Sequence, residues 1–245
     1  MVPVHMSSAD AKTKESQRKH VRYEVSDDCR IRASIMIRSS DAASANKDWS
    51  GMLVDMSSEG AHIQISMAAV AYKGDSCVMT LSHGGVKLQL RGSLAHYICS
   101  ARHSVCGVKF DFHTAGADKA YLPYFKAIVA SSTLTGGTTD SDMPGRYREE
   151  YRGPGHAMLV VWRDNKPERA LVGFDYTMAR YAAALATAGA DMFKNKGQVG
   201  FRAVPAAGAL SQAQEAEARW EFSLAASNLP KAIAPDIRRL LRLTS

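Results

Sequence analysis

The stretch CRIRASIMIR, residues 29–38, decides how the N-terminal half of the chain folds. Its apolar and polar residues alternate, with Ile31, Ala33, Ile35 and Ile37 on one face and Arg30, Arg32, Ser34 and Arg38 on the other. Successive side chains of a strand point to opposite faces, so strict alternation is typical of a strand that is buried on one side only. We therefore expect a half-buried β-strand here.

Apolar runs bounded by turn residues continue the β pattern after this strand. They predict strands at residues 50–56, 61–66, 77–82, 86–95 and 105–112, with a hairpin turn at His83-Gly84-Gly85. Short strands joined by turns, without helices between them, indicate an antiparallel barrel or sandwich. At residues 118–130 apolar residues recur at spacings of three and four, which predicts an amphipathic helix packed on the strands.

Two arginines, Arg18 and Arg22, precede the first strand at an offset of four residues. A guanidinium group matches the O6 and N7 acceptors of guanine with two hydrogen bonds, and it also pairs with phosphate. We expect both arginines to grip a guanine nucleotide by base and phosphate. Gln17 and Lys19 are further candidates beside them.

A second polar set lies in the segment DMSSEG, residues 55–60, which we place in a loop between two strands. The carboxylate of Asp55 suits the N–H donors on the Watson–Crick edge of guanine, and Ser57 can fill a remaining donor or acceptor position. Gly60 permits a positive φ or a close approach of the backbone to a ligand, and Ser58 is a weaker candidate. Taken alone, this set also suits an ordinary turn, and two arginines suit a solvated basic loop.

The order R-x-x-x-R, then D-x-S-x-x-G, then a strand containing Gly107-Val108-Lys109-Phe110, resembles the PilZ domain, the bacterial receptor module for cyclic di-GMP. The resemblance covers roughly residues 15–130, and both motifs are complete. It implies a six-stranded antiparallel β-barrel with a C-terminal helix. It also implies a cyclic di-GMP site made by Arg18, Arg22, Asp55, Ser57 and Gly60, with one ligand molecule or a stacked pair.

The formal charge of +7 and the pI near 9.3 favour anionic partners. A nucleic-acid-binding protein is therefore the alternative hypothesis, with the basic arm and the Arg/Tyr-rich residues 146–152 contacting phosphates and bases. We rank it below the nucleotide receptor. No apolar run approaches the roughly 20 residues that span a bilayer, and the N-terminus lacks a signal-peptide core, so we expect a cytoplasmic protein.

Cysteines and histidines gather in His96-x-x-Cys99 and His103-x-x-Cys106, a spacing that zinc sites also use. The same stretch reads as two strands around a bend, and residues three apart in a strand point to opposite faces. We therefore expect no bound metal and reduced thiols.

The second half of the chain matches no family that we recognise. Gly, Ser, Thr and Asp residues, followed by charged ones, predict a linker at residues 131–156. Beyond it we expect a hairpin of strands at 157–163 and 169–174, an Ala-rich helix at 177–193, a strand at 199–204, a helix from Ser211 to about 226 and a helix from Pro235 to Leu243. No nucleophile–base pair or metal-ligand set stands out, so we expect no enzymatic activity.

The sequence thus predicts a two-domain receptor. Its parts are a flexible tail at 1–14, a PilZ-like barrel domain with its arginine arm at 15–130, the linker at 131–156, and a smaller α+β domain of unknown function at 157–245. Cyclic di-GMP is the expected ligand, and no other cofactor is expected. Binding should order the arm and signal to a protein partner through the arm or the C-terminal domain.

Overall fold

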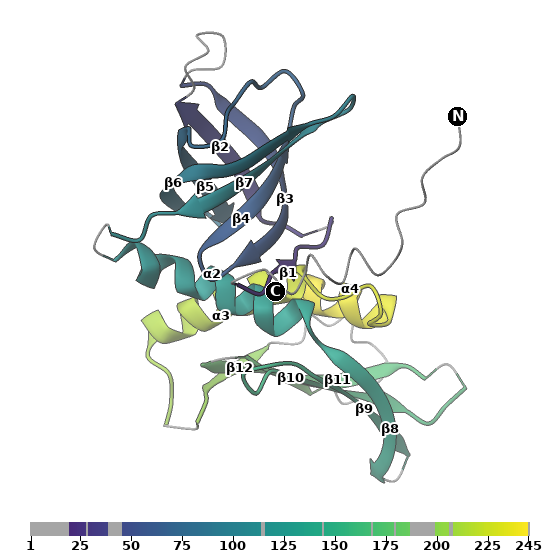
Figure 1. The fold of residues 1–245 in the computed structure, drawn as a ribbon. Helices are drawn as coiled ribbons and strands as arrows, with labels where there is room; N and C mark the ends of the chain where they lie inside the picture. Colours follow the sequence, from purple (N-terminus) through teal and green to yellow (C-terminus); the bar gives the residue numbers. More distant parts are fainter. Residues whose placement is uncertain are drawn as a thin grey trace, which may run out of the picture.

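The structure, a computed structural model, describes residues 20–27, 29–38, 46–113, 116–143, 145–167, 169–178, 180–186, 199–205 and 208–244. In this part of the chain, a closed β-barrel and a second antiparallel sheet lie on either side of a layer of helices (Figure 1). The predicted tail at 1–14 and the candidates Gln17, Arg18 and Lys19 lie outside the described residues.

Six antiparallel strands close the barrel in the order β3-β2-β5-β6-β7-β4, and β4 pairs back onto β3. They are β2 (Arg32–Arg38), β3 (Asp48–Ser57), β4 (Gly60–Ile65), β5 (Ser76–His83), β6 (Val86–Cys99) and β7 (Ser104–Phe110). A short strand, β1 (Tyr23–Glu24), pairs with the end of β3. The predicted six-stranded antiparallel barrel is confirmed.

The alternation that predicted β2 matches its burial. Ala33, Ile35 and Ile37 are buried inside the barrel, whereas Arg32 and Arg38 are exposed. Ile35 and Ile37 are 0% exposed, so the inner face of this strand is fully removed from water. Burial of such apolar side chains is the main source of the stability of the barrel.

The predicted helix after the barrel is α2 (Ala117–Ser132), which contacts β1, β3 and β6. Its buried side chains include Tyr121, Tyr124 and Ile128. Aromatic residues of the helix and of the barrel meet where α2 packs on the strands, and the Tyr121 ring lies 5.0 Å from the ring of Phe110 in β7. The helix therefore covers part of the barrel.

The second sheet is a meander in which each strand pairs with the next along the chain. Its strands are β8 (Thr135–Met143), β9 (Arg146–Arg152), β10 (Met158–Asp164), β11 (Leu171–Thr177), β12 (Tyr181–Ala186) and β13 (Gly200–Ala203). Two helices follow, α3 (Gln212–Ser227) and α4 (Pro235–Thr244). The hairpin of β10 and β11, strand β13 and both helices confirm the predicted elements, and Ser211 and Gln214 form the expected capping box.

The linker predicted at residues 131–156 is wrong, because α2 extends to Ser132 and β8 and β9 follow. Turn-forming residues, followed by charged ones, predicted a linker. In the structure β8 pairs with β9, and β9 pairs with β10 along its whole length. Strand formation depends on neighbours more than on intrinsic preference. Residues 146–152 also alternate with a period of two, with Tyr147, Glu149 and Tyr151 on one face, and this pattern is typical of a strand.

The helix predicted at residues 177–193 is also wrong, because the described part of this segment contains strand β12. Alanine favours helices, but pairing with β11 and β13 overrides that weak preference. Ala183 is fully buried within the hydrophobic core. A small side chain there leaves room for α3, which packs against β12.

Helix α3 joins the two β layers. Its Phe222 stacks on Phe174 of β11 at a centroid distance of 5.8 Å, while its Trp220 donates a hydrogen bond to the carbonyl of His83 on the barrel. Asn228, which ends the helix, accepts a hydrogen bond of 2.7 Å from the backbone of Ser26. Buried residues of both sheets belong to one hydrophobic cluster, and the division into two domains stays a prediction.

Phe222→Ala tests this packing. Phe222 is 0% exposed and also packs edge-on against Tyr176 and Phe201, so its truncation leaves a cavity under the second sheet. We expect a loss of about 3–5 kcal/mol in the free energy of unfolding, measured by urea denaturation. Ala216→Gly, at an exposed position of the same helix, is the control and should cost about 1 kcal/mol. Equal losses in the two variants would contradict the packing role of Phe222.

Candidate functional site

The predicted polar residues lie on the hairpin of β3 and β4. Asp55 and Ser57 belong to β3 and Gly60 opens β4, so the loop expected at residues 55–60 is wrong and only Ser58 and Glu59 form the turn. Ser57 pairs with Gly60 across the turn, and Asp55 pairs with His62. This register carries Asp55 and His62 to one point on the barrel wall.

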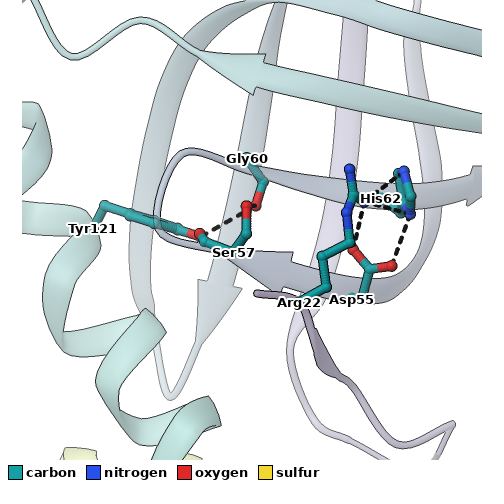
Figure 2. Close-up of polar contacts among 6 residues, drawn as sticks. All are labelled: Arg22, Asp55, Ser57, Gly60, His62 and Tyr121. Atoms are coloured by element: carbon teal, nitrogen blue, oxygen red, sulfur yellow. Dashed lines mark hydrogen bonds and ion pairs between the residues drawn. The ribbon is translucent and has the colours of Figure 1, made fainter. Parts of the chain in front are cut away.

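Arg22, Asp55 and His62 form a polar network on this hairpin (Figure 2). Nη1 of Arg22 donates to Oδ1 of Asp55 at 3.0 Å, and Nδ1 of His62 lies 2.7 Å from the other carboxylate oxygen. The same Nη1 lies 2.7 Å from Nδ1 and 2.6 Å from Nε2 of His62, so it meets the side of the ring rather than one nitrogen. Asp55 therefore anchors both neighbours.

The network keeps Asp55 ionised. Burial opposes ionisation, but the hydrogen bond and charge of His62, together with Arg22, outweigh burial and lower the pKa of Asp55 below its ordinary value. Because an ionised carboxylate only accepts hydrogen bonds, we assign the proton of the short contact to Nδ1 of His62.

Ser57, Gly60 and Tyr121 form a second polar group at the turn end of the hairpin (Figure 2). The hydroxyl of Ser57 donates to the carbonyl of Gly60 at 3.3 Å. The hydroxyl of Tyr121, on α2, donates to the carbonyl of Ser57 at 2.6 Å. The turn is therefore tied directly to the helix.

Gly60 is required by close packing between strands. It is not among the residues of positive φ, so the first of the two expected reasons for a glycine, a left-handed backbone, is not found. A Cβ at this position would lie 2.2 Å from the carbonyl oxygen of Val108 on β7. The absent side chain lets β4 approach β7 at this point of the barrel.

A hollow of about 300 Å³ lies beside the hairpin, at the small end of the size range of ligand pockets. Its lining includes Arg22, Ser57, Gly60, His20 and Lys109. Asp55 is not part of the lining and lies behind Arg22 with 15% of its side chain exposed. The structure thus brings four of the predicted residues to one place, three of them at the surface of the hollow.

Ser58 and Glu59 hold His20 at the edge of the hollow. Nδ1 of His20 lies 3.0 Å from the hydroxyl of Ser58, and Nε2 lies 3.1 Å from a carboxylate oxygen of Glu59. His20 lies between Arg18 and Arg22 in the predicted arm and is the first residue of the arm that the structure describes. Ser58 therefore contacts the N-terminal segment rather than the hollow.

Two histidines of the site, His62 and His96, were not assigned to it from the sequence. His62 is found by counting the hairpin register back from a two-residue turn, which sets it opposite Asp55. The His96 ring lies 4.7 Å from that of His62, above Gly107, where a Cβ would come within 2.1 Å of the imidazole. Burial, and then the charges of His62 and Arg22, lower the pKa of His96. The lowered pKa favours the neutral form of His96.

No cysteine is among the residues that form the polar network or line the hollow in the described part of the chain. Cys77 and Cys106 are buried, and burial raises the pKa of each thiol to about 12. Within the described residues, no group of three or more His, Cys, Asp or Glu side chains is arranged to hold a metal ion. No helix in the same part of the chain is long and apolar enough to cross a bilayer.

No protein-family model matches the chain, and no curated protein matches it.

Asp55→Asn tests the polar network through pH. A carboxylate whose pKa is lower in the folded state stabilises the fold above its ordinary pKa of 3.8 and loses this effect as pH falls through the folded value. Wild type should exceed Asp55→Asn in stability at pH 7, and the difference should shrink below about pH 4. Urea denaturation between pH 7 and pH 3 measures it, with the exposed Asp111→Asn as control. A difference independent of pH would contradict the network.

Gly60→Ala tests the close approach of β4 to β7. The added methyl group meets a backbone carbonyl that cannot move without disturbing the barrel, so we expect a loss of about 1–3 kcal/mol. Gly200→Ala is the matched control, because a Cβ at that strand position would lie 3.9 Å from the nearest atom. Thermal unfolding compares the two variants, and an equally mild effect at both positions would refute the steric argument.

Proposed function

We propose that the protein is a cyclic di-GMP receptor of the PilZ type, and that its ligand binds in the hollow beside Arg22. The observation that carries this proposal is that only one nitrogen of the Arg22 guanidinium group is hydrogen-bonded within the described residues. Its Nη1 is held by Asp55 and His62, while Nε and Nη2 make no hydrogen bond within the described residues. A guanidinium group held at one corner offers its remaining edge to a ligand.

That edge suits a guanine nucleotide. Two parallel N–H donors match either the O6 and N7 atoms of guanine or two phosphate oxygens. Lys109 and His20 also line the hollow, and the Lys109 ammonium group adds a positive charge for a phosphate. The lining thus combines a guanidinium fork with a phosphate-binding cation.

Asp55 takes a different role from the one that its motif suggested. Both of its oxygens already accept hydrogen bonds, and the side chain lies behind Arg22. We propose that Asp55 is a positioning residue, which fixes the orientation of Arg22 before the ligand arrives. Preorganisation of this kind lowers the entropic cost of binding.

Ser57 and Gly60 connect the ligand to the rest of the molecule. They line the hollow, and Tyr121 of α2 bonds to both of their carbonyl groups. Helix α2 in turn packs against α3, which lies on the second sheet. We propose that a ligand at the hairpin shifts α2 and so signals to a protein partner, with Arg18 contributing a second guanidinium group from the arm.

The alternative of nucleic-acid binding was based on the basic arm and on the Arg/Tyr-rich residues 146–152, and the contacts of residues 146–152 do not favour it. Arg148 and Arg152 both pair with Glu150, and Tyr151 is buried with its hydroxyl bonded to Glu149. Residues 146–152 therefore form a paired strand rather than a basic, aromatic surface for a single strand.

Isothermal titration calorimetry with cyclic di-GMP tests the proposal. Wild type should bind saturably, and Arg22→Ala should weaken binding at least about tenfold, because it removes a bidentate contact. Asp55→Asn should weaken binding less, because Arg22 remains present but loses its anchor. Arg102→Ala is the control and should bind like wild type. Arg102 is exposed in the turn between β6 and β7, at the opposite end of β7 from the site.

Two results would overturn the proposal. One is the absence of saturable heat from wild type that is folded by circular dichroism. The other is binding of single-stranded DNA that strengthens with strand length and falls steeply with salt, which would favour the nucleic-acid alternative.

A further inference from the structure

A row of residues crosses four strands on the outer wall of the barrel. Arg38 of β2 pairs with Ser76 of β5, Ser76 pairs with Ser93 of β6, and Ser93 pairs with Lys109 of β7. Directly opposed residues in antiparallel strands share one face of the sheet. Two serines therefore lie between two long cationic side chains whose Cα atoms are roughly 14 Å apart along the sheet.

A hollow of about 490 Å³ lies over this row, larger than the one beside Arg22. It is lined by Arg38, Ser76, Ser93 and Lys109, and also by Arg91, two residues before Ser93 on the same face of β6. Its volume falls within the roughly 300–1,000 Å³ of small-molecule sites. The place is thus a concavity with a hydroxyl-bearing floor and three cations at its edge.

The charge of this hollow is unbalanced. Within the part of the chain that the structure describes, no carboxylate forms an ion pair with Arg38, Arg91 or Lys109. The one carboxylate in the lining is Asp111, whose Oδ1 accepts a hydrogen bond from the backbone N–H of His113. Like charges gathered over low-dielectric walls raise the local concentration of anions.

We propose that this hollow is a second anion-binding site, which takes a small phosphate ester of about the size of a mononucleotide. Arg38 and Arg91 bind phosphate oxygens with paired N–H donors, and Lys109 supplies a point charge from the opposite side. The hydroxyls of Ser76 and Ser93 donate to the oxygens that remain. Lys109 also lines the hollow beside Arg22, but the roles of Arg38, Arg91, Ser76 and Ser93 do not depend on the proposed cyclic di-GMP site.

Asp111 favours a small ligand over a polymer. It lies at the rim next to Arg91, where its backbone N–H donates to the Arg91 carbonyl at 2.8 Å. The backbone of a longer polyanion leaving the hollow on this side would meet its negative charge. A compact phosphate ester contacts the three cations without passing the rim.

Titration with inorganic pyrophosphate, at constant ionic strength, tests the site in the full chain. Backbone amide signals of Ser76, Ser93 and Lys109 should shift and saturate in ¹H–¹⁵N NMR spectra. A nucleoside diphosphate should bind the same residues at least as tightly, and a single-stranded oligonucleotide serves as the polyanion arm. Calorimetry with pyrophosphate gives the affinity of each variant.

Arg91→Gln should weaken pyrophosphate binding about tenfold, since it removes a charged hydrogen-bonding partner. Arg102→Gln, which removes the same charge from the turn at the other end of β7, should change the affinity less than about twofold. Arg22→Ala should also leave it within about twofold, so failure of the cyclic di-GMP proposal and failure of this one are distinguishable. All three side chains are at least partly exposed, so the variants should fold.

Three results would overturn the proposal. The first is the absence of saturable shifts with either phosphate compound. The second is an equal loss of affinity in Arg91→Gln and Arg102→Gln, which would indicate general charge attraction. The third is an oligonucleotide affinity that rises with length while pyrophosphate stays unbound, which would make the hollow part of a nucleic-acid surface.

Discussion

The close approach of β4 to β7 at Gly60 is the constraint on which the rest of this barrel depends. A side chain there would run into the carbonyl of Val108, so β4 and β7 could pair at the hairpin of β3 and β4 only with a local shift of the barrel wall. The same hairpin register sets Asp55 opposite His62 and lets Asp55 hold Arg22. The register of the β3–β4 hairpin therefore determines both how β4 meets β7 and which side chains meet at the candidate site.

The site is also connected to the rest of the molecule by few and specific contacts. Tyr121 bonds to the carbonyls of the turn, and α2 rests on α3, which is packed against the second sheet. Asn228 binds the backbone next to β1, close in sequence to Arg22. A change at the hairpin thus has a short, packed route to α3, because interiors transmit small displacements rather than absorb them.

The two hollows on the barrel wall share Lys109, which faces outward from β7 between Gly60 and Ser93. Small residues on both sides of it leave the wall open, and long basic side chains stand around the openings. The excess positive charge of the chain is therefore not spread evenly, since part of it gathers where the wall is hollow. Composition alone indicates anionic partners but does not place them.

Local periodicity was sufficient for most elements. Strands such as β2, with alternating Ile and Arg, and helix α3, opened by Ser211 and Gln214, follow from spacing and capping that need no distant partner. Prediction failed for β8, β9 and β12, where Gly- and Thr-rich or Ala-rich sequence takes extended form because neighbouring strands supply its hydrogen bonds. Those partners are the adjacent strands of the meander, and several of them are poorly marked in the sequence themselves, so local preference pointed elsewhere.

By itself, the sequence determined the antiparallel β character of the first half, the helix after it, and the set of polar residues from which a site could be made. Only the tertiary structure decided that Asp55 lies behind Arg22, that His62 and His96 join them, and that Ser57 and Gly60 are tied to Tyr121. It alone aligned Arg38 with Lys109 across four strands. The physical reason is that residue types and spacing specify which side chains share a strand face, whereas strand register and barrel closure specify which strands are neighbours.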